Sequence, residues 1–132
     1  MTASVPPDIA AELRRLLQNS HAPYSGVRVA AAVEAPDGRI HYGVNVENAA
    51  YPEGVCAEAS AISAAVTAGA PAIARVFVAS SLPGVIWPCG GCRQKIWEFS
   101  QAGCEVMSVD SGGETQSHAI EELLPLGFRL PR

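Results

Sequence analysis

Two short segments carry the residues of this chain that could do chemistry: Cys-Ala-Glu at 56–58 and Pro-Cys-Gly-Gly-Cys at 88–92. Together they offer three thiolate ligands and one carboxylate. Zinc favours sulfur and imidazole ligands, and a site with three protein ligands keeps a fourth position open for water, whose pKa zinc lowers to about 7. The spacing therefore predicts an open zinc site with Cys56, Cys89 and Cys92 as ligands.

The ligands can converge on one ion only if helix ends present them. A Cys-x-x-Cys pair at the start of a helix brings two sulfurs together, and the free N–H groups of the first turn can hydrogen-bond the thiolates. Gly90 and Gly91 remove side chains that would crowd them. Cys56 and Glu58 lie two residues apart and would face nearly opposite directions in mid-helix. We therefore expect Cys56 at a helix end.

Two other interpretations of the cysteines stay open, a closed structural zinc site and a redox Cys-x-x-Cys pair. A closed site needs a fourth ligand. Cys104 falls in a predicted strand, where a small apolar role is expected. His21, His41 and His118 have no zinc-ligand spacing to the other cysteines.

Hydrophobic spacing predicts helices alternating with strands. We expect helices over about 8–19, 55–68, 88–101 and 118–124, and strands over 27–33, 40–46, 75–80, 104–109 and near residue 115. Asp37-Gly38 favours a hairpin turn between the first two strands. Asn45 and Glu47 would share one face of the second strand. The order implies an α/β fold whose helices cover a mixed sheet opened by a β-hairpin.

Composition limits the classes of function. A chain of 132 residues, with about half of them apolar, is expected to form one domain over 1–132. The net charge of −4 argues against binding nucleic acid, which needs clustered Lys and Arg. Neither a membrane helix nor a secretion signal is evident, so a cytoplasmic protein without membrane partners is expected. Four cysteines in such a protein favour metal or catalytic thiols over disulfides.

These motifs, in this order, resemble the cytidine deaminase family, in particular its small one-domain branch with three cysteine ligands. The resemblance covers most of the chain, including Ala-Pro-Tyr-Ser at 22–25, Gly-Val-Asn-Val-Glu-Asn at 43–48 and Glu-Leu-Leu-Pro at 122–125. It implies a three-layer α/β/α sandwich that binds Zn²⁺ and hydrolyses cytidine or deoxycytidine to uridine or deoxyuridine with release of ammonia. A free pyrimidine nucleoside as substrate, a role in pyrimidine salvage and a homotetramer are implied as well.

The same resemblance implies roles for single residues. Glu58 would carry a proton from water to the pyrimidine ring nitrogen and then protonate the departing amine. Asn45 and Glu47 match the pair that holds the ribose hydroxyls, although a solvated strand face is the alternative. The Ala57 backbone N–H would lie near the pyrimidine carbonyl. Phe128 would complete a neighbouring subunit's pocket, with plain C-terminal packing as the alternative.

Several positions depart from the family pattern. Val27, expected against the base, replaces a Phe, and the lost aromatic face costs about 1 kcal/mol of stacking and widens the pocket. Ala30 stands where Gly is common. Ala59 replaces an Arg that hydrogen-bonds the sulfurs, so helix N-termini and Arg93 must balance the site's negative charge. A tryptophan directly before Pro88, at position 87, is also unusual for the family.

These departures keep two alternatives open. The first is the same deamination of a different aminopyrimidine or modified nucleoside, such as a blasticidin-like one. The second is a non-catalytic, zinc-stabilised binding module, for which removal of Glu58 would change no activity.

Overall fold

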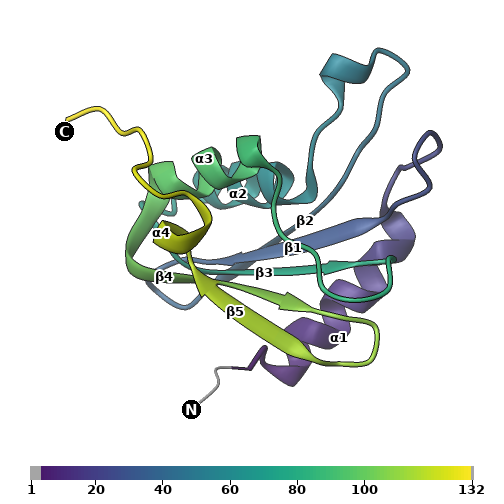
Figure 1. Ribbon diagram of the computed structural model, residues 1–132, viewed down its shortest axis with the longest axis horizontal. Coiled ribbons are helices and arrows are strands. Elements are labelled where there is room, and N and C mark those ends of the chain that lie inside the picture. Colours follow the sequence, from purple (N-terminus) through teal and green to yellow (C-terminus); the bar gives the residue numbers. More distant parts are fainter. Residues whose placement is uncertain (1–3, 132) are drawn as a thin grey trace.

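The protein, described here over residues 4–131 by a computed structural model, is built on one five-stranded sheet (Figure 1). Its strands are β1 (Val29–Glu34), β2 (Ile40–Val44), β3 (Ile73–Ser80), β4 (Ser100–Val109) and β5 (Thr115–Ala119). Its helices are α1 (Pro7–Leu16), α2 (Ala57–Thr67), α3 (Gly90–Phe99) and α4 (Ile120–Leu123), with 3₁₀ turns η1 (Leu17–Asn19) and η2 (Tyr51–Glu53). Among residues 4–131 no helix is long and apolar enough to cross a bilayer.

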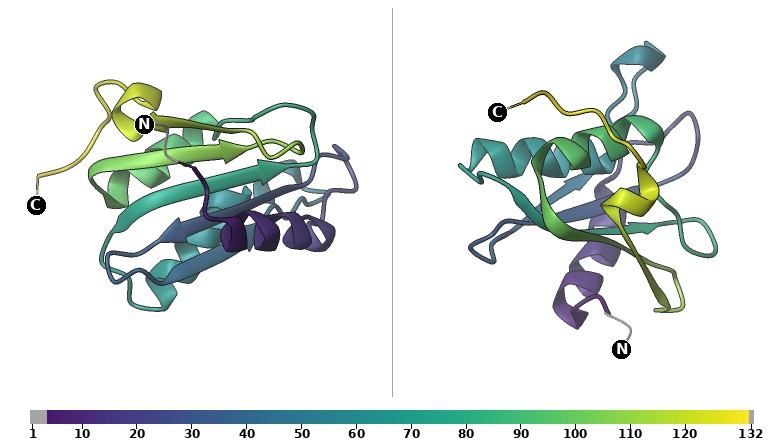
Figure 2. Two further views of the ribbon diagram at one scale, coloured as in Figure 1. Left: turned by 90° about the horizontal axis from the view of Figure 1, so that it is seen from below. Right: turned by 60° about the vertical axis from the view of Figure 1, so that its left-hand side comes forward.

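The sheet has the order β2-β1-β3-β4-β5 and is mixed, because only β3 and β4 run parallel. Helix α1 covers one face, and α2 and α3 cover the other (Figure 2). Successive side chains of a strand point to opposite faces, so Ala30 packs on the α1 side and Ala31 on the α2 side. The predicted three-layer sandwich opened by a β-hairpin is confirmed.

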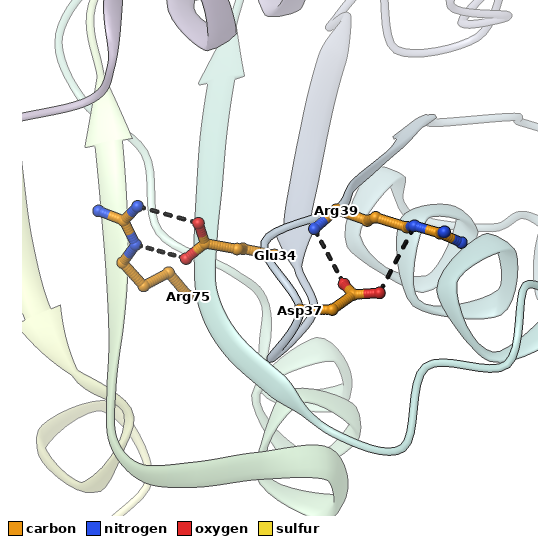
Figure 3. Close-up of polar contacts among 4 residues, drawn as sticks. All are labelled: Glu34, Asp37, Arg39 and Arg75. Atoms are coloured by element: carbon orange, nitrogen blue, oxygen red, sulfur yellow. Dashed lines mark hydrogen bonds and ion pairs between the residues drawn. The ribbon is translucent and has the colours of Figure 1, made fainter.

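Two arginine–carboxylate pairs hold the hairpin and its neighbour in place (Figure 3). Glu34 of β1 and Arg75 of β3 are directly paired in the sheet, and the guanidinium donates from Nε at 2.7 Å and from Nη2 at 3.1 Å to the two carboxylate oxygens. In the turn, Asp37 accepts the Arg39 backbone N–H at 3.0 Å, and Gly38 has a positive φ of 88°. Both contacts favour one strand register.

Most element boundaries differ from the predictions by a few residues. Helix α1 ends at Leu16, where η1 follows, rather than at 19; β1 begins at Val29 rather than 27; and residues 118–119, predicted in the last helix, belong to β5.

Four further differences concern β2, α2, α3 and β4. Strand β2 ends at Val44, so Asn45 and Glu47 lie beyond the strand on which a shared face was predicted. Helices α2 and α3 begin at Ala57 and Gly90, two residues later than predicted, because an extended cysteine precedes each as its N-cap. Strand β4 starts at Ser100 rather than 104, directly after α3.

Gly43 in β2 allows α2 to lie directly on the sheet. A Cβ at this position would stand 2.4 Å from the Ala61 backbone nitrogen and 2.8 Å from the Ala57 carbonyl oxygen. No side chain can be accommodated there without moving helix backbone. The depth of α2, and with it the position of Cys56 and Glu58, therefore depends on the missing side chain.

Candidate active site

The two cysteine segments meet at the N-termini of α2 and α3. Cys56 is the N-cap of α2 and Cys89 the N-cap of α3, both with extended backbone. Their carbonyl oxygens accept the first helical hydrogen bonds, from the Ser60 N–H at 3.1 Å and the Arg93 N–H at 2.9 Å. The position of Cys56 at a helix end, required by its spacing from Glu58, is thus present in the fold.

Three sulfurs converge there. The Sγ atoms of Cys56, Cys89 and Cys92 all lie within 4.8 Å of one another, and those of Cys56 and Cys89 are 3.8 Å apart. Tetrahedral zinc with Zn–S bonds of about 2.3 Å separates its sulfurs by about 3.8 Å. The residues therefore suit a zinc ion.

The cluster has three members within residues 4–131, and neither Glu58 nor Cys104 is one of them. Cys104 is fully buried in β4, and that burial raises its pKa to about 12. It is the inert strand residue predicted from its context. A three-member cluster favours an open site over a closed structural one.

Helix geometry and burial act in opposite directions on the thiols. The Cys92 backbone N–H donates to the Cys89 sulfur and lowers its pKa, as expected at a helix N-terminus. Desolvation raises the pKa of Cys56 and of Cys92. Since a metal binds the thiolate form, metal binding must release protons from the buried thiols, and affinity should rise with pH.

The side chains of Arg93 and Lys95 lie near the N-terminus of α3, but no hydrogen bond that the structure describes joins either of them to a cysteine sulfur. The Arg93 guanidinium donates from Nε to the Pro88 carbonyl at 2.7 Å and from Nη1 to the Leu123 carbonyl at 2.9 Å. It therefore fastens the residue before Cys89 to the end of α4. Lys95 shares a groove between α2 and α3 with Ala59, and its Nζ lies 3.8 Å from where a Gly91 Cβ would be.

Glu58, in the first turn of α2, is only 4% exposed. Desolvation raises the pKa of its carboxyl group above the ordinary value. A carboxyl group with a raised pKa can hold a proton at pH values where an exposed glutamate is ionised. Glu58 is thus suited to accept and return protons.

A cavity of about 200 Å³ opens over these residues. Its lining combines the cysteine segments with residues of β1, the end of β2 and the segment before α3: Val29, Asn45, Cys56, Ala57, Glu58, Ile86, Trp87 and Cys89. The predicted residues Asn45 and Ala57 are therefore in the cavity. Val29, Ile86 and Trp87 were not predicted there as lining residues.

Val27 does not line this cavity, whereas Val29, two residues further on, does. The Val27 carbonyl accepts a hydrogen bond from Asn45 Nδ2 at 2.8 Å, which places Val27 beside the rim. Ala30 packs in the core under α1, on the other face of the sheet. The exchange of Gly for Ala at position 30 therefore does not reshape the cavity directly.

Asn45 and Glu47 hold the segment that leads into β1. Asn45 Oδ1 accepts hydrogen bonds from the Val29 N–H at 2.8 Å and from the Ser20 hydroxyl. Glu47 Oε1 accepts the backbone N–H groups of Tyr24 and Ser25 at 3.0 and 3.1 Å, and Oε2 accepts the Ser25 hydroxyl.

Glu47 lines a second cavity, of about 360 Å³, together with residues of the 22–25 loop and of the η2 loop. Tyr24 and Tyr51 stand there edge to face, with ring centroids 5.7 Å apart. The structure thus puts Asn45 and Glu47 in different cavities, whereas strand periodicity predicted a common face. The chain leaves the sheet at Val44, so a two-residue period no longer applies to them.

Phe128 lies on a C-terminal strap, residues 124–131, and is 66% exposed. It lines neither cavity of its own chain. Leu126 and Leu130 on the same strap are exposed as well. Three large apolar side chains at alternate positions are thus unburied within residues 4–131 of a single chain.

The side chains between them fasten the strap to α3. The Arg129 guanidinium stacks on the Trp97 ring at 4.1 Å and donates to the Trp97 carbonyl. Gln94 Nε2 donates to the Phe128 carbonyl at 2.8 Å. Gly127 packs so closely that a Cβ would stand 2.9 Å from Trp97 Nε1, a buried donor with no partner among residues 4–131.

Replacing Arg129 by alanine is expected to loosen the strap without unfolding the domain. The lost contact between the guanidinium and Trp97 contributes about 0.5–1 kcal/mol at an exposed site. Amide hydrogen exchange over 124–131 should accelerate, whereas exchange in β3 should not change. Arg129→Lys, which keeps the charge but not the planar group, should give an intermediate rate; equal rates in all three proteins would mean that other contacts hold the strap.

Comparison with known proteins relates the chain to one family. Residues 8–108 match the family described as the cytidine and deoxycytidylate deaminase zinc-binding region. A cytidine deaminase of Sporosarcina psychrophila is 35% identical over 120 residues, covering 91% of this chain and 88% of the relative, and one of Mycoplasma genitalium is 34% identical over 122 residues, covering 92% and 93%. The crystal structure of a cytidine deaminase from Burkholderia pseudomallei superimposes with a TM-score of 0.85 at 33% identity, covering 94% of this chain and all of that one.

Proposed function

Because this chain belongs to the cytidine and deoxycytidylate deaminase family, we propose that it hydrolyses cytidine or deoxycytidine to uridine or deoxyuridine and ammonia. The observation that carries the proposal is the convergence of three cysteine sulfurs, two of whose residues, Cys56 and Cys89, line one cavity together with the buried Glu58. Cys56, Cys89 and Cys92 would hold zinc, which when bound supplies a Lewis acid that makes water a better nucleophile near neutral pH.

Glu58 is assigned the proton transfers. Its buried carboxylate takes a proton from the attacking water and delivers it to the pyrimidine ring nitrogen. The oxygen of that water bonds to C4, and Glu58 then moves the proton of the new C4 hydroxyl group to the amino group, so that the C–N bond breaks, ammonia leaves and the C4 carbonyl of uridine forms. The raised pKa of Glu58 supports this role, because a general acid and base works best with a pKa near the working pH. The Ala57 N–H is assigned to the pyrimidine carbonyl.

Asn45 and Glu47 are assigned to the sugar. After its bonds to the protein, Asn45 has one N–H left, and ionised Glu47 has room for about one more donor. Each is therefore assigned one hydrogen bond to a sugar hydroxyl, Asn45 as a donor and Glu47 as an acceptor, each from its own cavity.

We also propose a cytoplasmic homotetramer that acts in pyrimidine salvage, with residues 1–132 as one domain and without nucleic-acid or membrane partners. The exposed, anchored strap supports the assignment of Phe128 to a neighbouring subunit's pocket. A second candidate substrate is a bulkier modified cytidine. Val27, beside the rim of the cavity, leaves more room than the phenylalanine found at this position in the family. Ala30 gives that alternative no support.

Ammonia release tests the proposal. Zinc-loaded protein is expected to release ammonia from cytidine and deoxycytidine, and chelator-treated protein is expected to regain this activity only when zinc is returned. A panel with cytosine and modified cytidines in the same assay separates the two substrate classes. Zinc-loaded protein that leaves every aminopyrimidine of the panel intact would favour the non-catalytic binding module.

A further inference from the structure

Ser25 is the residue in contact with both oxygens of the Glu47 side chain. Its backbone N–H donates to Oε1 at 3.1 Å and its hydroxyl donates to Oε2. The same hydroxyl accepts the Val27 N–H at 3.0 Å, two residues further along the loop. Ser25 therefore ties the carboxylate to the backbone of its own loop.

The loop that carries Ser25 is itself well fixed. The Gly26 N–H donates to the Ala22 carbonyl at 3.0 Å, and Gly26 has a positive φ of 73° that suits glycine. The third donor to Glu47 is the Tyr24 N–H. A carboxylate held by three donors from one tight loop has little freedom to rotate.

From this geometry we propose that Ser25 is a positioning residue, which orients Glu47 so that its free acceptor site faces the sugar hydroxyl of the substrate. The inference rests on the proposed function, in which Glu47 binds the sugar. The hydroxyl group of Ser25 also lowers the pKa of Glu47 more than any other group does, which keeps the carboxylate ionised as an acceptor. This role would explain the contacts of Tyr24 and Ser25 with Glu47, although their loop does not line the cavity at the cysteines.

Removal of the hydroxyl should weaken sugar recognition alone. Ser25→Ala is expected to lower kcat/KM for cytidine and for deoxycytidine by about three- to tenfold, mainly through KM. With 2′,3′-dideoxycytidine, which offers neither ring hydroxyl to Glu47, the variant and the unmodified protein should differ by less than about twofold. Ser25→Thr, which keeps the hydroxyl, should restore the values for cytidine.

Ser80→Ala is the matched control. The Ser80 hydroxyl accepts the N–H of Leu82 at 3.1 Å in the same two-residue pattern, but no carboxylate is bound to it by any hydrogen bond that the structure describes. Ser80→Ala should therefore change kcat/KM for the three substrates by the same factor, if at all. Thermal unfolding of each variant shows whether its fold is intact.

An equal loss for cytidine and dideoxycytidine in Ser25→Ala would overturn the proposal, because Ser25 would then only hold its loop. Failure of Ser25→Thr to restore KM would also count against it. If the unmodified protein releases no ammonia from cytidine, the proposed function itself fails and this inference with it. That result differs from an equal loss of activity on cytidine and dideoxycytidine in Ser25→Ala, which would overturn this inference alone.

Discussion

Replacing Glu58 by glutamine is expected to lower kcat for cytidine deamination by about 10²- to 10⁴-fold, the contribution typical of a positioned general acid and base. Glutamine has nearly the same shape and cannot carry the proton. Because Glu58 is almost fully buried and its pKa is raised, a neutral amide should be tolerated there without loss of stability. Ammonia release, zinc content and thermal unfolding should be measured on the same preparations.

The control is Glu121→Gln. Glu121 also lies in the first turn of a helix, α4, but it is exposed. Its replacement should leave kcat unchanged. If Glu58→Gln keeps zinc and retains full activity, another group carries the proton and the assignment of Glu58 is wrong. If activity disappears only together with zinc, Glu58 supports the metal site rather than the chemistry.

Replacing Gly43 by alanine is expected to lower the free energy of unfolding by about 3 kcal/mol or more, at the upper end of overpacking effects. The added Cβ would collide with backbone atoms of α2, among them Ala61 N and Ala57 O, which cannot rotate away as a side chain could. Relief requires α2 to lift from the sheet. That motion would carry Cys56 and Glu58 away from Cys89, so zinc affinity should fall as well.

Denaturant unfolding and competitive zinc titration check this result, with Gly112→Ala as the control. Gly112 lies in the β4–β5 turn, where a Cβ would come no nearer than 3.4 Å to Asp110 Oδ1 and the φ angle is not positive. Its replacement should change stability little. Unchanged stability and zinc affinity in Gly43→Ala would mean that α2 can shift at low cost, so that its depth does not set the site.

Much of the candidate site could be predicted from sequence because its chemistry depends on residue type at short range. Two cysteines three apart at a helix start, and a cysteine two residues before a glutamate, restrict where the helices can begin; α2 and α3 do begin directly after Cys56 and Cys89. Local patterns likewise predicted the hairpin at Asp37-Gly38 and the alternation of helices with strands. The position of Cys104 in a predicted strand indicated that it is a small apolar residue rather than a metal ligand.

Long-range contacts decided what local patterns could not. Asn45 and Glu47 were predicted on one strand face, but side-chain bonds to Val29, Tyr24 and Ser25 act where the chain leaves the sheet, and no local period describes such bonds. The choice of Val29 over Val27 as a cavity residue depends on how β1 meets the helix ends.

The sequence by itself therefore determined the α/β class and the family, and it singled out the three cysteines and Glu58 for which the zinc and proton-transfer roles are proposed, since these follow from residue identity and short spacing. Only the tertiary structure decided which residues share the cavity with them. It also revealed the contact of Gly43 with α2, the hydrogen bond from Arg93 to the Leu123 carbonyl and the anchoring of the C-terminal strap on Trp97. Each joins residues at least 14 apart in the chain, and such contacts form only when the elements pack.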